Sequence, residues 1–218
     1  NIKFNGNFDF SKLKSRIIFD FTEDISNSFK FIIQQKINQR NKIDYKGKLS
    51  ISDNNIFING KAFSSFLNLD EIFPNIAQSN LIKNKIRHYV NATNAKNLIN
   101  LDFEIEKINF FKSNFNFTKF NLNFFENKIY IKNFVSNFEK SPISGFLNVN
   151  LRKKALDGKL TVKKFYIKKD YFGSTKIDFY DGYANCFADF KLDFKSNDFV
   201  KLTNNLRSKG KCNIGKIK

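Results

Sequence analysis

Residues 184–194, ANCFADFKLDF, alternate between apolar side chains and side chains that are mostly polar. The apolar positions hold Ala184, Cys186, Ala188, Phe190, Leu192 and Phe194. Successive side chains of a β-strand point to opposite faces of a sheet, so a period of two predicts a strand with one dry and one wet face. A strand of about eleven residues is at the long end of the usual range.

The same alternation recurs along most of the chain. Leu101, Phe103 and Ile105 form one such run, and Leu147, Val149 and Leu151 form another. The alternation changes parity at residues 118–119 and again before residue 165, which predicts bulges. Residues 126–127 and 155–158 carry turn residues, and residues 29–37, FKFIIQQKI, favour a strand over a helix. The pattern predicts a mainly β chain folded as a long antiparallel β-meander.

Two stretches have helical spacing instead. Residues 69–90 place Ile72, Ile76 and Ile86 along one side, with acidic residues in the first turn and basic residues in the last. Residues 196–207 form a second, shorter candidate. We therefore expect one or two short helices and divide the chain into a β-segment at 1–68, a connecting helix at 69–92 and a β-region at 93–218.

The composition is strongly basic and rich in phenylalanine. The net charge is +18, and 29 of the 218 residues are Phe. The lysines are spread over the chain and fall mostly at the polar positions of the alternating runs, which indicates a solvated face. We expect the remaining positive charge to attract anionic lipid headgroups. No apolar run is long enough to span a bilayer as a helix, and no signal peptide is recognisable. Because the chain contains no Met, we expect a segment of a longer protein whose anchor lies elsewhere.

No constellation of catalytic or metal-binding residues is found in the sequence. His88 is the single histidine, and the nine glycines form no phosphate-binding loop. Cys186 and Cys212 lack metal-ligand spacing; two free thiols are favoured, with a disulfide as the alternative. The signature of an RNA-recognition sheet is absent. We therefore expect no enzyme activity, no cofactor, no metal and no nucleic acid.

From residue 99 onward, the order of features resembles the C-terminal region of the AsmA-like family of bacterial envelope proteins. Residues 141–151, SPISGFLNVNL, stand where that family starts a strand after a small residue and a glycine. Gly182, Tyr183 and Ala184 lead to Leu192, and residues 206–217, LRSKGKCNIGKI, match the closing stretch. That stretch departs from the family pattern, because Ser208 replaces its first glycine and residues 214–215 are Ile-Gly. Upstream, residues 47–51 and 67–70 resemble a family repeat that runs into a connecting helix.

The resemblance implies a long antiparallel sheet curved into a groove, within a periplasmic protein anchored to the inner membrane of a Gram-negative bacterium. It implies a non-enzymatic segment that binds or conducts phospholipid acyl chains for outer-membrane assembly and lipid homeostasis, like the bridge-like lipid transfer proteins. The anchor would lie outside this chain. The lipid-facing candidates are Ala184, Cys186, Ala188, Phe190, Leu192, Phe194, Leu147, Val149 and Leu151.

Two other functions are compatible with the same residues. In the first, the apolar face packs against a second sheet or the helix, and the chain is a structural or protein-interaction scaffold with a closed core. In the second, less favoured, the excess of cations makes it a basic nucleic-acid-binding domain.

Overall fold

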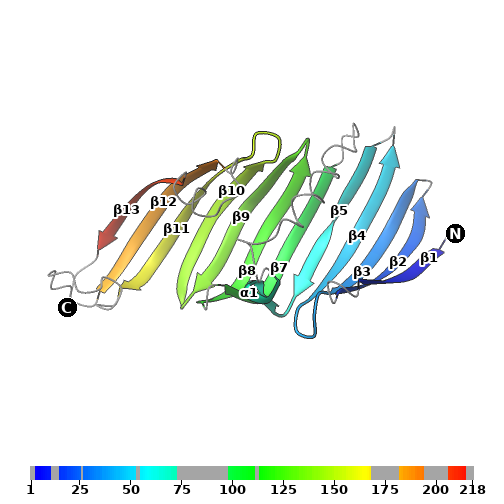
Figure 1. The fold of residues 1–218 in the computed structure, drawn as a ribbon, viewed down its shortest axis with the longest axis horizontal. Helices are drawn as coiled ribbons and strands as arrows, with labels where there is room; N and C mark the ends of the chain where they lie inside the picture. Colours follow the sequence, from blue (N-terminus) through cyan, green and yellow to red (C-terminus); the bar gives the residue numbers. More distant parts are fainter. Residues whose placement is uncertain are drawn as a thin grey trace.

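The part of the chain that the structure describes forms one large β-sheet with one short helix (Figure 1). The computed structural model describes residues 3–10, 15–25, 27–52, 55–72, 98–110, 113–167, 182–193 and 206–214. Within these ranges the sheet has 13 strands. The prediction of a mainly β chain with a long meander is confirmed.

The first half of the sheet contains β1 (Lys3–Phe10), β2 (Ser15–Ile25), β3 (Ser28–Lys36), β4 (Lys42–Ser52), β5 (Asn55–Ser64) and β6 (Leu67–Asn68), followed by α1 (Leu69–Ile72). The second half contains β7 (Leu98–Phe110), β8 (Ser113–Phe125), β9 (Lys128–Phe138), β10 (Ser141–Asn150), β11 (Ala155–Ile167), β12 (Gly182–Asp193) and β13 (Arg207–Ile214). The strand predicted at residues 29–37 corresponds to β3.

Strands follow one another across the sheet in chain order, from β1 at one edge to β13 at the other. Neighbouring strands are antiparallel with one exception, because β7 runs parallel to β5 and to β6. The predicted antiparallel meander therefore describes the sheet apart from this one parallel step. Parallel neighbours require a long crossover connection, and here the chain leaves the sheet after β6 and returns at β7. The sheet continues without a break across the boundary expected between residues 68 and 93.

A side-chain cap marks the point where the chain leaves the sheet. The Asn68 carboxamide oxygen accepts hydrogen bonds from the backbone N–H groups of Asp70 and Glu71, at 3.1 and 3.4 Å. The Asn68 Nδ2 donates in return to Glu71 Oε1, at 3.0 Å. This reciprocal arrangement is the side-chain cap expected at a helix start. The fully buried Asn41, which follows β3, accepts the Asn68 N–H and donates to Glu71 Oε2.

The two predicted helices are described only in part. The helix expected at residues 69–92 begins as predicted at Leu69, but the description ends at Ile72 and resumes at residue 98. Residues 196–205 of the second predicted helix lie outside the described residues. Its last residue, Arg207, is the first residue of β13 and not helical.

Turns and bulges lie close to the positions that the parity changes predict. Glu126 and Asn127 both have positive φ, at 46° and 61°, and join β8 to β9 in a tight hairpin. Phe117 and Lys164 also have positive φ and lie where the register of the sheet shifts. The strand pairing changes parity there, as expected for bulges.

The turn predicted at residues 155–158 is wrong, because these residues begin β11. The chain reverses at residues 151–154, where the Asn150 carboxamide oxygen accepts the N–H of Lys153 at 2.9 Å. Gly158 serves packing instead of a turn. A side chain there would meet the ring of Phe190 on β12, with the new Cβ only 2.6 Å from Cζ.

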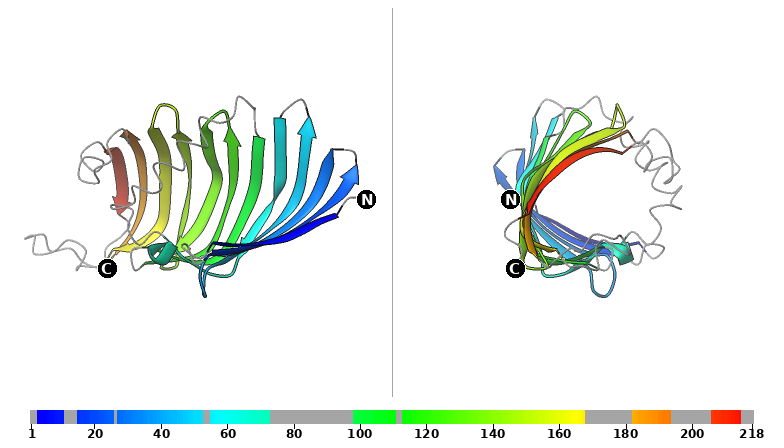
Figure 2. Two further views of the ribbon diagram at one scale, coloured as in Figure 1. Left: turned by 45° about the vertical axis from the view of Figure 1, so that its right-hand side comes forward. Right: turned by 90° about the vertical axis from the view of Figure 1, so that its left-hand side faces the viewer.

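The sheet is bent along its strands. Viewed end-on, in the right-hand part of Figure 2, the strands curve into a trough that is open on one side. The sheet therefore has a concave face and a convex face.

Candidate functional site

Apolar side chains form a continuous row across the sheet. Strand register places them directly opposite one another in the order Phe29, Leu49, Ile58, Ile99, Phe124, Ile129, Val149, Leu156 and Leu192. The row runs from β3 to β12. We call the face that carries it the inner face and the opposite one the outer face. Cross-strand neighbours of this kind are the unit that stabilises a sheet, so the row is a continuous apolar strip across the inner face.

Neighbouring residues of the same strand differ sharply in exposure according to their face. Phe31 on the inner face is 5% exposed, whereas Ile32 on the outer face is 57% exposed. Likewise, Ala184 is 1% exposed and Tyr183 is 59% exposed. Side chains converge on the concave side of a curved sheet and diverge on its convex side. We therefore assign the inner face to the concave side of the trough.

Aromatic rings interlock along the inner face in three groups. Phe21 contacts Phe19 and Phe31, with ring centroids 5.7 and 6.1 Å apart. Phe103 stacks on Phe120 at 4.7 Å, and Tyr45 meets Phe103 edge-on. The third group consists of Phe115, Phe138 and Phe165. Such contacts stabilise beyond the area they bury, so the curved sheet is held partly by its own inner surface.

Buried polar groups on the inner face are paired within the sheet. The hydroxyls of Thr118 and Ser136 share a hydrogen bond of 2.8 Å. The Tyr45 hydroxyl donates to Gln35 Oε1 at 3.3 Å, and burial raises the pKa of Tyr45 to about 12. The Tyr45 phenol therefore stays neutral at physiological pH.

The ion pairs of Lys30, Lys48 and Lys119 lie on the outer face. Lys30 and Lys48 are directly opposite each other, and Asp24 binds both at 2.7 and 2.6 Å. Hydrogen bonds from Lys30 and then from Lys48 lower the pKa of Asp24. Lys119 pairs with Glu104 at 3.2 Å on the same face. These charged side chains are thus kept off the inner face by the alternation of the strands.

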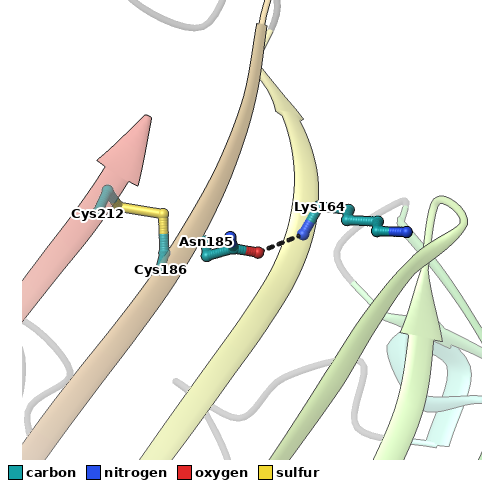
Figure 3. The surroundings of a disulfide bond; sticks show 4 residues. All are labelled: Lys164, Asn185, Cys186 and Cys212. Atoms are coloured by element: carbon teal, nitrogen blue, oxygen red, sulfur yellow. Dashed lines mark hydrogen bonds between the residues drawn. A yellow bond between two sulfur atoms is a disulfide. The ribbon is translucent and has the colours of Figure 1, made fainter. Parts of the chain in front are cut away.

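A disulfide joins Cys186 to Cys212, which corrects the expectation of two free thiols. The two residues are direct partners of β12 and β13, with Cα atoms 4.1 Å apart. Figure 3 shows the disulfide on one side of β12 and the Asn185 side chain on the other. Asn185 Oδ1 accepts the backbone N–H of Lys164 at 2.9 Å. Sequence spacing could not reveal this bond because the register of β12 and β13 creates it.

The sequence-predicted candidates lie on the inner face wherever the structure describes them in strands. Phe190 is opposite Gly158, which is opposite Leu147, and the row defined above contains Val149 and Leu192. Ala184, Cys186 and Ala188 follow along β12 on the same side. Ala184 is too buried to offer contact area, and Cys186 is in the disulfide. Leu151 lies in the turn after β10, and Phe194 lies outside the described residues.

Within the sheet, the candidate list covers only β10 and β12 and missed the other strands of the inner face. The aromatic groups around Phe21 and Phe103 belong to the same inner face as β12. Residues 17–21 and 101–105 show the same alternation of apolar and polar side chains that identified the candidates on β10 and β12. Only the continuous strand pairing shows that both halves contribute to one surface.

No family model matches the chain, and neither a curated protein nor a solved structure matches it. Among the described residues, no helix is long and apolar enough to cross a membrane. The same residues contain no cluster of His, Cys, Asp or Glu suited to a metal ion.

Proposed function

We propose that the chain is a non-enzymatic module that binds phospholipid acyl chains along its inner face. The observation that carries the proposal is the uninterrupted apolar row on the concave side of an open sheet. Among the described residues no second sheet covers this face. The side chains of the row are half-buried, so part of their apolar surface stays accessible. Accessible apolar surface in a soluble protein marks a site of interaction, and an acyl chain is the simplest apolar partner for a long shallow surface.

The dimensions of the row suit a lipid conduit. From β3 to β12 there are eight strand-to-strand steps of about 4.8 Å each, or roughly 38 Å. One leaflet of a bilayer has a hydrocarbon depth of about 15 Å, half of the core thickness, so the row exceeds the reach of a single tail. Each buried methylene contributes about 0.8 kcal/mol. A tail can therefore bind without specific polar contacts, and its headgroup remains in water.

The same proposal extends to location and context. A disulfide persists in oxidising compartments, among them the bacterial periplasm, and Cys186–Cys212 supports such a location. The disulfide and the resemblance to AsmA-like proteins together support a further proposal. We propose that the chain is a periplasmic segment, held at the inner membrane of a Gram-negative bacterium by an anchor elsewhere in the protein. Conduction of phospholipid toward the outer membrane is the corresponding role.

The rival function is a structural or protein-interaction scaffold whose apolar face is fully packed. In that case the purified chain would carry no lipid. Native mass spectrometry of the chain, purified without detergent, distinguishes the two because co-purified phospholipid is expected only for the binding module.

A matched pair of variants tests which face binds. Leu160 lies on the inner face opposite Ala188 and is 37% exposed, whereas Val135 lies on the outer face opposite Lys119 and is 45% exposed. Leu160→Asp should reduce the co-purified phospholipid about tenfold or more, because a carboxylate beside an acyl chain loses hydration. Val135→Asp should leave the lipid unchanged.

Far-ultraviolet circular dichroism of both variants checks that the sheet is intact. Equal lipid content in the two variants, or its absence from the unmodified chain, would contradict the proposal.

A further inference from the structure

The outer face of the last strands carries a cluster of exposed aromatic side chains. Phe146, Tyr166, Tyr183 and Phe187 come from β10, β11 and β12 and are all exposed. Tyr166 and Tyr183 are direct partners with ring centroids 5.3 Å apart. We call these four residues the aromatic patch. They lie on the charged side of the sheet, where the alternation predicts polar residues.

Cations border the aromatic patch. The Lys159 ammonium lies 5.7 Å from the centroid of the Phe187 ring. On the neighbouring edge strand β13, Arg207, Lys209 and Lys211 are exposed, and Lys211 is directly opposite Phe187. We call these three residues the basic edge.

The net charge of this region is positive. The outer positions of β11, β12 and β13 hold Lys159, Lys191 and the basic edge, against Asp157, Asp189 and Asp193. Lys159 and Asp189 pair at 3.9 Å, and Asp189 is also directly opposite Lys209 on β13. The three carboxylates therefore offset part of the five cations and leave an excess of positive charge.

We propose that the aromatic patch and the basic edge form a docking surface for an anionic phospholipid bilayer. Tyrosine and other amphipathic rings favour the headgroup level of a membrane, and lysine and arginine near the surface are attracted by anionic lipids. The combination of exposed rings with flanking cations fits that interface by charge complementarity. The same strands end the apolar row on their inner face, so docking there places the row next to a source of lipid.

This surface is separate from the inner face, and its test does not depend on acyl-chain binding. The full chain of 218 residues is sedimented with vesicles of phosphatidylcholine alone and with vesicles that also contain phosphatidylglycerol. We expect binding to the second kind, weakened by added salt because exposed charges are screened.

Two double variants separate the contributions of charge and rings. A cation near an anionic membrane strengthens binding about fivefold, so Lys209→Gln with Lys211→Gln should weaken binding to the anionic vesicles about 30-fold. Tyr183→Ser with Phe187→Ser should weaken binding and leave its salt dependence in place. The Leu160→Asp variant should still bind vesicles.

Matched controls come from the other half of the outer face. Phe63 is 44% exposed, compared with 39% for Phe187, but its direct partners are Asp44 and Glu104. Phe63→Ser should therefore have no effect. Lys46 and Lys61 are exposed direct partners, so Lys46→Gln with Lys61→Gln repeats the change in net charge outside the proposed surface.

Several results would overturn the proposal. These are an absence of binding to anionic vesicles, equal losses in the patch and control variants, and salt-dependent binding to DNA or RNA that the patch variants abolish while vesicle binding persists. Circular dichroism and a thiol assay confirm that each variant keeps its sheet and its disulfide.

Discussion

Tyr45 places a phenol hydroxyl on the inner face. Its ring meets Phe103 edge-on at 6.3 Å, and its hydroxyl donates to Gln35. The neutral hydroxyl makes this contact without cost, but an ionised phenolate would be desolvated. Burial therefore raises the pKa of Tyr45 to about 12. The packing of the inner face is consequently destabilised when alkaline pH ionises this phenol.

Tyr45→Phe should reduce the loss of stability at high pH. The unfolded phenol titrates near 10, below the folded value, so the unfolded chain releases its proton first. Stability from this group is complete below pH 10 and falls as pH rises toward 12, by an amount on the order of 2 kcal/mol. Urea unfolding at pH 8 and at pH 11 measures the difference. An identical pH dependence in the variant would contradict the buried, neutral hydroxyl.

At the scale of elements, β13 is an edge strand with little buried surface. Each of its residues is exposed, and it pairs only with β12 among the described strands. Alternating cations on an edge strand discourage pairing with other chains. The covalent link between Cys186 and Cys212 compensates for the small contact area.

Reduction of the disulfide should release β13 before the rest of the sheet. The bond spans 26 residues, and closing a loop of that length stabilises by roughly 3–4 kcal/mol in the chain-entropy account. Hydrogen exchange with and without reductant should show lost protection in β13 and retained protection in β7, β8 and β9. Unchanged protection of β13 would show that its backbone ladder suffices. A Cys186→Ser, Cys212→Ser variant controls for effects of the reductant on other groups.

At the scale of the whole molecule, the two faces of the single curved sheet are suited to different environments. The outer face carries the ion pairs of Lys30, Lys48 and Lys119 in water. The inner face is apolar from β3 to β12, and a single layer cannot bury both sides of itself. Ligands that cover the inner face should therefore stabilise the fold by mass action.

Delipidation should expose the inner face to small apolar probes. We expect the delipidated chain to bind an apolar fluorescent dye and to release it on titration with a lysophospholipid. The melting temperature should rise in the same titration, with about 2.7 kcal/mol gained at a hundredfold excess over Kd. A chain that binds no dye after delipidation would have a covered inner face. Leu160→Asp should weaken the lipid response, and Val135→Asp should preserve it.

Part of this fold was predictable from local patterns. Alternation assigns Leu101 and Phe103 to one face and Asp102 to the other, and the structure agrees. The parity change near Thr118 correctly indicated the bulge at Phe117, because one extra residue moves every later side chain to the other face. The misplaced turn at residues 155–158 shows the limit, since a glycine can serve packing under Phe190 as well as a turn.

The order of apolar and polar residues is enough to assign side chains to the two faces, because the period of two is a property of the extended backbone. Which strands are neighbours became known from the fold alone. The parallel pairing of β5 with β7 and the bond between Cys186 and Cys212 depend on register across long connections. The bend of the sheet then decided that the apolar face is the concave one. Local alternation carries no information about partner or curvature, since both arise from contacts between residues far apart in the chain.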